Sequence, residues 1–342
     1  MYTVDFPPRL SLARTPTPLQ FLPRLSRELG GPDIWVKRDD LTDCAVSGNK
    51  IRKLEFTLAR ALSEGCNVLI TAGGAQSNHC RATAILGAQL GLKVHLILRR
   101  EGRDAGYPEG NLMLSELAGA KISLYSKTEY QQGLPELFDH WTEYYRGEGG
   151  KPWSIPVGAS DGTGVWGYIN GARELRQDFQ DAGIKPAAIV HATGSGGTQA
   201  GLTAGAELYQ LDCPVIGMAV CDNERYFLDK VRADLRQWRS LYRAQIDGCA
   251  PEFDVEKLNI VVNDDYIGPG YARAGAEVFD TISLAARTEG LIFDPVYTGK
   301  GFHGLVEEIR QGYFQGNDAV VFIHTGGIFG LMAQADLLYS SK

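Results

Sequence analysis

Short runs of apolar, mostly branched residues recur along the chain and are separated by longer segments of helical period. These runs predict strands over residues 68–70, 94–98, 188–190, 215–218, 258–262 and 320–323. The segments between them are about as long as crossover helices, so the alternation predicts a mainly parallel sheet flanked by helices. Ligands in such folds bind at the carboxyl ends of the strands. Candidate chemistry is therefore expected where the apolar runs end.

One polar segment, residues 47–55, leads from a glycine turn into an amphipathic helix and places Lys50 near the helix start. A lysine must lose its proton to attack an aldehyde, and partial burial helps because it lowers the lysine pKa. Lys50 is therefore the candidate for a Schiff base with a cofactor aldehyde. Lys53, one helical turn further on, and Lys37 are the alternatives. The alternative is that Lys50 is an ordinary solvent-exposed lysine at a helix start with no catalytic role.

A second segment follows the strand expected over residues 188–190 and precedes a helix-like stretch. It consists of Thr193, Gly194, Ser195, Gly196, Gly197 and Thr198. Glycines let backbone N–H groups close on an anion, hydroxyls add donors, and a helix N-terminus contributes a favourable dipole. No Walker lysine follows, and the glycine spacing misses the dinucleotide fingerprint, which disfavours ATP and NAD. The segment predicts a cradle for a cofactor phosphate, and a turn without a ligand is the alternative.

A third segment, residues 73–79, lies between an expected strand and an expected helix. Backbone donors of Ser77, Asn78 and His79 at the helix start suit the carboxylate that all amino acids share. Gln76 and His79 are expected to shape this carboxylate cradle. For His79, a structural hydrogen-bonding role is the alternative to a catalytic one.

Composition narrows the class of partner. The 342-residue chain is 44% hydrophobic and 22% charged, with a net charge of -7 and no basic run. Nucleic acid and anionic membranes are therefore disfavoured, and a small-molecule substrate is expected. No apolar run approaches the roughly 20 residues of a membrane span, and no signal-peptide pattern is present, so we expect a cytoplasmic protein. The six cysteines lack CxxC spacing, and neither a metal site nor a disulfide frame is expected.

Together and in this order, the three segments resemble the fold-type-II pyridoxal-phosphate (PLP) enzymes. The similarity is to the branch that holds D-cysteine desulfhydrases, 1-aminocyclopropane-1-carboxylate (ACC) deaminases and L-cysteate sulfo-lyases. It extends over nearly the whole chain, including residues 16–19, 35–40, 294–300 and 324–327.

The resemblance implies pyridoxal 5'-phosphate as the cofactor and a homodimer as the assembly. It also implies a tryptophan synthase beta-like α/β fold with two open parallel-sheet domains. A large PLP-binding domain is expected from residues 1–56 plus 167–342, and a small domain, residues 57–166, is expected to close over the site.

Individual roles also follow from the resemblance. Lys50 bonds the cofactor, Ser77 lies close to the substrate, and Asn78 bonds the phenolic oxygen of the cofactor. Tyr297 and Tyr271 match two active-site tyrosines, and a phenol at short range can relay a proton or polarise a leaving group. The residues leave open which of Lys50 and Ser77 removes the α-proton from which enantiomer.

Thr298 and Thr325 distinguish members of the branch. The cyclopropane deaminases carry Glu and Leu at these places, whereas desulfhydrase-like members carry hydroxyl residues. A Glu beside the pyridine nitrogen keeps that nitrogen protonated, and a Thr hydroxyl is a weaker, neutral partner. Arg273 follows Tyr271 where this chain departs from the family pattern, so Arg273 is expected either near the substrate or on a solvated helix face.

The expected reaction is β-elimination from a small amino acid, with D-cysteine giving pyruvate, ammonia and hydrogen sulfide. L-cysteate, whose sulfonate could engage Arg273, and β-chloroalanine-like compounds are alternative substrates. Deamination of ACC is disfavoured by Thr298 and Thr325. An amino-acid racemase, a β-replacement synthase and a binding protein that has lost turnover are the remaining alternatives.

Overall fold

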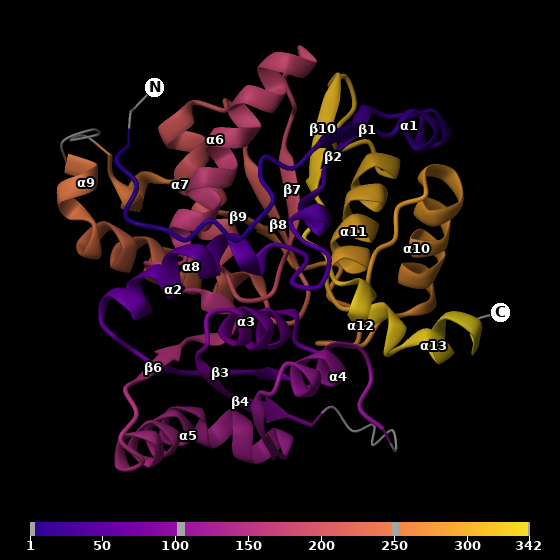
Figure 1. The fold of residues 1–342 in the computed structure, drawn as a ribbon. Coiled ribbons are helices and arrows are strands. Elements are labelled where there is room, and N and C mark those ends of the chain that lie inside the picture. Colours follow the sequence, from indigo (N-terminus) through magenta and orange to yellow (C-terminus); the bar gives the residue numbers. More distant parts are fainter. Residues whose placement is uncertain (1–3, 101–106, 248–252, 341–342) are drawn as a thin grey trace.

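The computed structural model describes residues 4–100, 107–247 and 253–340. Within these ranges ten strands form two open sheets, and helices cover both faces of each sheet (Figure 1). The α/β class with parallel-sheet bodies is the one predicted from the alternation of apolar runs. Across the described residues, no helix has the combination of length and apolar character that crossing a bilayer requires.

The larger sheet draws its strands from both ends of the chain. Its described strands, in spatial order, are β1 (Leu19–Phe21), β2 (Asp33–Lys37), β10 (Ala319–Ile323), β7 (Ile189–Thr193), β8 (Val215–Ala219) and β9 (Val261–Asn263). All neighbours are parallel except β1 and β2, which pair antiparallel. The carboxyl ends of β7, β8 and β10 consequently lie at one edge.

Two helical layers bury this sheet. Val321 and Ile323 of β10 point into one core, and Val320 and Phe322 point into the other, as the two-residue period of a strand requires. One face is covered by α6 (Val165–Ala182), α7 (Gly197–Tyr209) and α8 (Glu224–Leu241). The other face is covered by α1 (Pro23–Leu29), α10 (Ala276–Glu289) and α11 (Thr298–Arg310).

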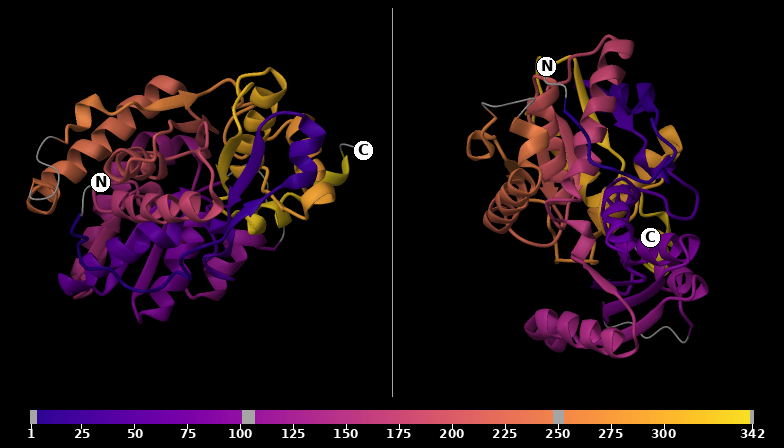
Figure 2. Two further views of the ribbon diagram at one scale, coloured as in Figure 1. Left: turned by 90° about the horizontal axis from the view of Figure 1, so that it is seen from above. Right: turned by 60° about the vertical axis from the view of Figure 1, so that its left-hand side comes forward.

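The smaller sheet comes from the early middle of the chain, and its neighbours are all parallel. Its described strands are, in order, β5 (Lys121–Tyr125), β4 (Lys93–Arg99), β3 (Val68–Gly74) and β6 (Pro152–Ile155). One face packs on α2 (Lys50–Ser63), α3 (Asn78–Gln89) and α4 (Gly110–Leu117), and the other on α5 (Lys127–Gly147). Figure 2 shows this body beneath the larger one, with α5 on its outer side.

Shorter elements complete the described chain. They are η1 (Asp39–Leu41), η2 (Val157–Ala159), α9 (Arg243–Asp247), η3 (Val255–Lys257), α12 (Ile328–Met332) and α13 (Ala335–Ser340).

All six strands predicted from apolar runs are present, as β3, β4, β7, β8, β9 and β10. The apolar pattern does not predict β1, β2, β5 and β6. These four strands are edge strands or mix charged and polar residues with apolar ones, as in the Lys-Ile-Ser-Leu-Tyr of β5. A half-buried strand gives a weaker pattern than one buried on both faces. The exact domain boundaries stay a prediction.

Candidate active site

One cavity of about 990 Å³ between the two sheet bodies collects most of the residues selected from the sequence. It lies at the carboxyl ends of β3, β7, β8 and β10, where ligands of open α/β sheets bind. The predicted residues in its wall are Lys50, Ser77, Asn78, His79, Thr193, Gly194, Ser195, Gly196, Thr198, Tyr271, Tyr297 and Thr325. Gly197 and Gln76 are not among the described residues that line it.

Lys50 is the first residue of α2 and is partly exposed to the cavity. The preceding turn is held against the end of β10, because the Asn49 N–H donates to the Thr325 carbonyl at 3.2 Å. Gly48 has φ +100°, and a Cβ there would lie 2.4 Å from the same carbonyl oxygen, so only glycine fits. Burial lowers the Lys50 pKa to about 8, which makes the neutral, nucleophilic amine accessible near physiological pH.

The two competing lysines are engaged elsewhere. Lys37 is buried, and its ammonium donates to the Thr17 carbonyl and to Asp178, each at 2.6 Å. Lys53 is fully buried behind the cavity wall, with its Nζ 3.3 Å from the Ser160 hydroxyl. Neither lysine lines the cavity, so the geometry favours Lys50 among the three.

The glycine segment forms the turn from β7 into α7, with backbone N–H groups at a helix N-terminus. Gly196 has φ +84°, and a Cβ on Gly194 would lie 3.0 Å from the Tyr297 ring. The N–H of Gly197 already donates to the Ser160 hydroxyl at 3.1 Å, so this amide belongs to the support of the loop. Buried Thr193 Oγ1 has no hydrogen-bond partner among the residues that the structure describes.

These observations fit a bound phosphate. A helix N-terminus favours an anion, and glycines at positions 194 and 196 let it approach the backbone. A buried hydroxyl without a partner is costly unless a ligand supplies one, and Thr193 lines this cavity. The residues to hold the phosphate group of PLP are therefore present around α7.

The carboxylate cradle lies at the start of α3. Ser77 is the N-cap, and its Oγ accepts from the Cys80 N–H at 3.2 Å. The N–H groups of Asn78 and His79 lie in the first helical turn, where the helix itself provides no acceptor. Asn78 Oδ1 accepts from Arg81 at 3.1 Å, which fixes the amide orientation. The cradle can therefore present backbone donors to a carboxylate.

His79 is neutral in this environment. Its Nε2 lies 2.8 Å from Thr71 Oγ1, and the Thr71 hydroxyl donates to the Ile155 carbonyl. Thr71 must therefore accept from His79, which places the ring proton on Nε2 and leaves buried Nδ1 as an acceptor with no partner in the described part of the chain. Burial, with the nearby charges of Lys50 and Lys53, holds the His79 pKa well below its usual value.

Gln76 supports the cradle from behind. Its amide donates to the Glu109 carbonyl at 3.0 Å and its Oε1 accepts from the Asn111 N–H at 2.9 Å. The side chain therefore ties the loop before α3 to the start of α4. This arrangement is consistent with the expected role of Gln76 in shaping the cradle, and its contact with a substrate stays a prediction.

Tyr271 and Tyr297 meet in the cavity wall. Their hydroxyl oxygens are 2.7 Å apart, and their rings make an edge contact. Burial, together with Tyr271, raises the Tyr297 pKa well above its usual value, so this phenol keeps its proton at neutral pH. The Arg99 guanidinium lies 5.0 Å from the centre of the Tyr271 ring. The pair can pass a proton along a short path.

The sequence predicts that Thr298 faces the cofactor ring, but Thr298 is not among the described residues that line the cavity. It is fully buried, and its hydroxyl donates to Asp294 Oδ1 at 2.7 Å. Asp294 also accepts from the backbone of Val296 and Tyr297, so its carboxylate organises the whole turn before α11. Of the two discriminating threonines, Thr325 is the one in the cavity wall.

The outer rim of the cavity is cationic. Exposed Arg273 lines it, together with Arg99, Arg100 and Lys127. Asp222 is the one carboxylate among the described lining residues. The rim is therefore suited to substrates that carry negative charge. Of the two positions predicted for Arg273, near the substrate or on a solvated helix face, its place in the cavity lining favours the first.

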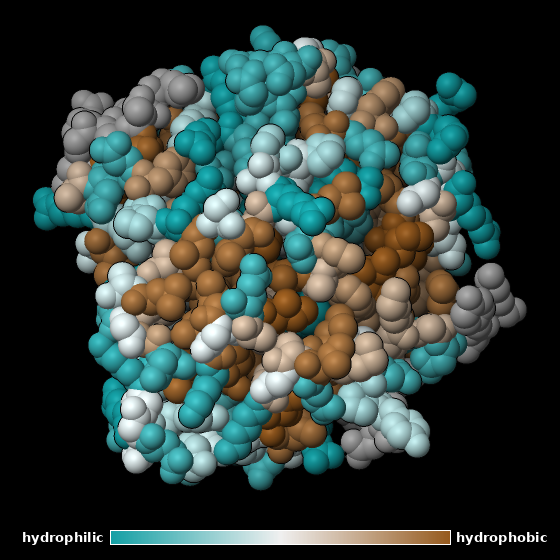
Figure 3. Space-filling model, in the orientation of Figure 1, coloured by the Kyte–Doolittle hydropathy of each residue, from teal (hydrophilic) through white to brown (hydrophobic). Residues whose placement is uncertain are grey.

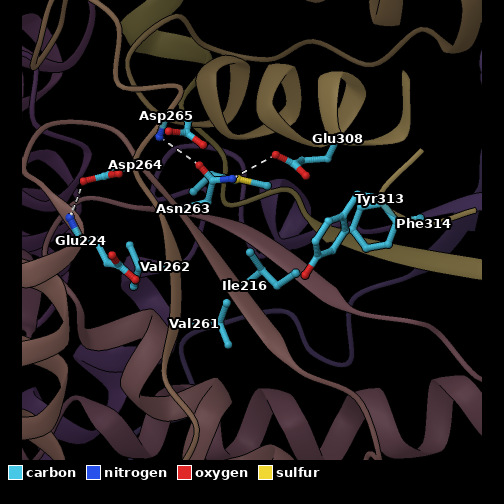
Figure 4. A pocket seen from close by; sticks show the side chains of 11 residues that line it. Ile216, Glu224, Val261, Val262, Asn263, Asp264, Asp265, Glu308, Tyr313 and Phe314 are labelled. Carbon is cyan, nitrogen blue, oxygen red and sulfur yellow. Dashed lines mark hydrogen bonds between the residues drawn. The ribbon is translucent and has the colours of Figure 1, made fainter. Parts of the chain in front are cut away.

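A second cavity, of about 330 Å³, lies beside β9 (Figure 4). Its rim carries Glu224, Asp264 and Glu308, and the Glu308 carboxylate accepts from the side-chain amide of Asn263 at 3.0 Å. None of the residues selected from the sequence lines this cavity, and its described lining includes no lysine. It is not a candidate for the Schiff-base chemistry.

A desolvated lysine, an anion cradle at a helix N-terminus and a carboxylate cradle facing one cavity define an enzyme that uses a phosphorylated aldehyde. The chain belongs to the pyridoxal-phosphate dependent enzyme family, whose model matches residues 10–326. Its cofactor is accordingly pyridoxal 5'-phosphate.

Relatives narrow the branch. The chain is 42% identical over 328 residues to a putative ACC deaminase of Thermotoga maritima, covering 96% of this chain and 98% of the relative. It is 40% identical over 341 residues to a mitochondrial bifunctional D-cysteine desulfhydrase/ACC deaminase of Arabidopsis thaliana, covering 96% and 80%. A solved ACC deaminase homologue superimposes with a TM-score of 0.87 at 35% identity, covering 98% of this chain and 96% of that one. The branch recognised from the motifs is thereby confirmed.

Sequence reasoning missed several contributors to the site. Ser160 supports both the glycine loop and Lys53, and Arg99 stacks over Tyr271. Arg81 is fully buried and joins α3 to the loop before Lys50 through the carbonyls of Val46 and Ser47. No motif singles out these three residues, because their partners are distant in sequence.

Proposed function

We propose that the protein catalyses PLP-dependent β-elimination from a small amino acid, with D-cysteine as the first substrate. The observation that carries this proposal is the convergence of Lys50, the α3 cradle, the glycine loop and the tyrosine pair on one cavity. The products would be pyruvate, ammonia and hydrogen sulfide, with one water consumed. The bifunctional relative, named for D-cysteine desulfhydrase, supports the choice of substrate.

Each part of the site has a task in this reaction. Bound PLP supplies an aldehyde for the substrate amine and an electron-withdrawing ring that makes loss of the α-proton possible. The first turn of α3 binds the substrate carboxylate, and the α7 N-terminus holds the phosphate. Thr325 and Asn78 are proposed to contact the cofactor from the wall. Lys50 or Ser77 accepts the α-proton, and the geometry assigns no enantiomer to either residue.

Proton delivery to the leaving group falls to the tyrosines. Tyr297 stays protonated at neutral pH and is hydrogen-bonded to Tyr271, so the pair can donate a proton to the departing sulfur. Neutral His79 accepts no further proton in this range. We assign it a structural role in orienting the start of α3.

A panel of D- and L-amino acids tests the proposal. D-cysteine should yield pyruvate and sulfide in equal amounts, and Lys50→Ala should yield neither. Interconversion of enantiomers without pyruvate would identify a racemase. Faster release of a four-carbon keto acid from ACC than of pyruvate from D-cysteine would identify a deaminase.

The cationic rim favours L-cysteate as a second candidate substrate. A sulfonate buried without a cation is costly, and Arg273 lies at the rim where a substrate side chain would point away from the carboxylate cradle. Arg273→Ala should therefore abolish sulfite release from cysteate while leaving D-cysteine turnover largely intact. If the parent protein released sulfite from cysteate faster than sulfide from D-cysteine, cysteate would become the first candidate substrate.

A homodimer is proposed as the assembly. An apolar patch lies on the face where α3, α4 and α12 come together (Figure 3), and Met113 and Met332 are about half-exposed on α4 and α12. A second copy would cover such a patch. Met332→Glu should shift sedimentation toward the monomer, whereas Leu124→Glu, on β5, should not. The cytoplasmic location expected from the sequence stays a prediction.

A further inference from the structure

Lys300 is a buried cation outside the machinery described so far. It is the third residue of α11 and only 1% exposed. Its ammonium donates to the carbonyls of Ile267 at 2.7 Å, Gly270 at 2.6 Å and Val220 at 3.3 Å. Among the described residues no carboxylate lies within ion-pair distance of it. All three protons of the ammonium are thus directed at main-chain oxygens.

Such an arrangement is expensive in free energy. A buried ammonium loses its hydration, and carbonyl dipoles replace it less completely than a carboxylate would. An apolar side chain in the same place would avoid this cost. The presence of a lysine at position 300 is explained by where the three carbonyls lie, because a side chain without donors could not bind them.

The three carbonyls belong to segments that form the catalytic wall. Val220 follows β8, and its N–H donates to the Thr193 carbonyl beside the glycine loop. Ile267 and Gly270 lie in the turn that ends at Tyr271. Lys300 itself lies one helical turn after Tyr297, which is the N-cap of α11. One ammonium therefore connects both tyrosines and the edge of the glycine loop.

The backbone of the turn before Tyr271 is conformationally permissive, and one main-chain hydrogen bond, from the Arg273 N–H to the Gly270 carbonyl at 3.2 Å, spans its end. Gly268 and Gly270 have φ +65° and +115°, and a Cβ on either would meet nothing within 4 Å. Ala272 is also in the left-handed region, with φ +56°. A turn with two open glycines has wide conformational freedom, so its anchors determine where Tyr271 lies.

We propose that Lys300 is a positioning residue that holds the Tyr271 turn against α11 and so maintains the hydroxyl contact between Tyr271 and Tyr297. This inference rests on the proposed function, in which that pair delivers a proton to the leaving group. Lys300 touches neither substrate nor cofactor in this assignment. It acts through Tyr271.

A double-mutant cycle tests this route. Lys300→Met in the holoenzyme should lower kcat at least about tenfold and change KM less than about threefold, because it affects the proton relay and not the carboxylate cradle. In a Tyr271→Phe background the same change should lower kcat less than about twofold, since the hydroxyl to be positioned is already absent. An equal fold loss in both backgrounds would overturn the proposal.

Lys37→Met is the matched control. Lys37 is equally buried and also bonded to a main-chain carbonyl, but it lies away from the cavity. Any effect it has on kcat through stability should be the same with Tyr271 or Phe at position 271. If Lys300→Met does not fold, Lys300→Gln enters the same cycle, because its neutral amide keeps two N–H donors in place of the ammonium.

Hydrogen exchange gives a readout that does not depend on turnover. Lys300→Met should speed deuterium uptake in a peptide spanning residues 264–275, and Tyr271→Phe should not. Unchanged uptake in Lys300→Met would overturn the proposal. If the parent protein eliminates nothing from any amino acid, the proposed function fails, and the exchange measurement alone decides whether Lys300 anchors the turn.

Discussion

At the scale of single residues, access to the cavity decides which of three lysines can do chemistry. Lys37, Lys50 and Lys53 lie within seventeen positions of one another in sequence. The Lys37 ammonium forms an ion pair with Asp178, and the Lys53 ammonium is buried next to the Ser160 hydroxyl. Lys50 lines the cavity. A desolvated amine that faces an open cavity is the one able to meet an aldehyde.

Replacing Lys50 should abolish covalent attachment of the cofactor. We expect Lys50→Ala to lower kcat by at least about a hundredfold, because the residue bonds the cofactor and can accept the α-proton. Borohydride reduction followed by peptide mass analysis should find the cofactor mass on the Lys50 peptide of the parent protein and not in the variant. Exposed Lys93→Ala is the control and should retain the label. Label on Lys53 or Lys37 would contradict the assignment.

The pKa of Lys50 also predicts how cofactor uptake depends on pH. Because this pKa is lowered to about 8, the reactive neutral amine is a minor species below pH 8 and predominates above it. The rate at which PLP-free protein forms the imine should rise about tenfold per pH unit below pH 8 and level off above it. Stopped-flow absorbance measures this rate. A rise that continues to pH 10 would indicate an unperturbed lysine.

At the scale of elements, the site depends on turns that press strand ends against helix starts. The turn before α2 touches the end of β10, and the glycine loop joins β7 to α7. Asn49 Nδ2 donates to Thr198 Oγ1 at 3.0 Å, so the starts of α2 and α7 are joined directly. Helix starts that are fixed to each other hold the lysine and the phosphate cradle at a constant separation.

Gly48 provides a sharp test of this packing. Gly48→Ala should lower the free energy of unfolding by at least about 2 kcal/mol and weaken PLP retention, because the new Cβ would press on the Thr325 carbonyl. Gly91→Ala is the control, since Gly91 has φ +70° and open space around it. It should cost only about 1 kcal/mol of left-handed strain. Equal losses in chemical denaturation would show that the contact with Thr325 is unimportant.

At the scale of the whole molecule, a buried charge network joins the start of the chain to α2 and α6. Arg52 pairs with Asp39 and Glu174, each at 2.8 Å, and Tyr168 donates to Asp39 at 2.6 Å. Burial alone would raise the Asp39 pKa, but Arg52 and Lys37 hold it below its usual value. Arg52 follows Lys50 by two residues on α2 and therefore points to another side of the helix, so the network supports the first turn of α2 from the side away from the cavity.

Loss of one partner should destabilise the protein strongly. Asp39→Asn leaves Arg52 buried with reduced compensation and should cost about 3–5 kcal/mol in chemical denaturation. Because the folded Asp39 pKa is lowered, its contribution is present above pH 4 and is lost as the pH falls below that value, and the variant should lack this acid-dependent step. Glu143→Gln, in an exposed pair with Arg146, should change stability by less than about 0.5 kcal/mol.

Much of this protein is determined locally and can be read from sequence. Apolar runs predict six strands, including the edge strand β9, and glycines followed by hydroxyl or amide residues at helix starts predict the anion sites. A positive φ or an open helix N-terminus is a property of a few consecutive residues, so the turn at Gly48, the loop at Gly196 and the cradle at Ser77 leave a sequence signature.

Only the tertiary structure decides which of these local features meet. The separation of Tyr271 from Tyr297, the engagement of Thr298 by Asp294, and the support from Ser160 and Lys300 all depend on contacts between distant segments. Parallel strands bring their carboxyl ends to a common edge, but the packing of the helices decides which side chains reach it. Burial, which lowers the Lys50 pKa and raises that of Tyr297, exists only once both sheet bodies enclose the cavity.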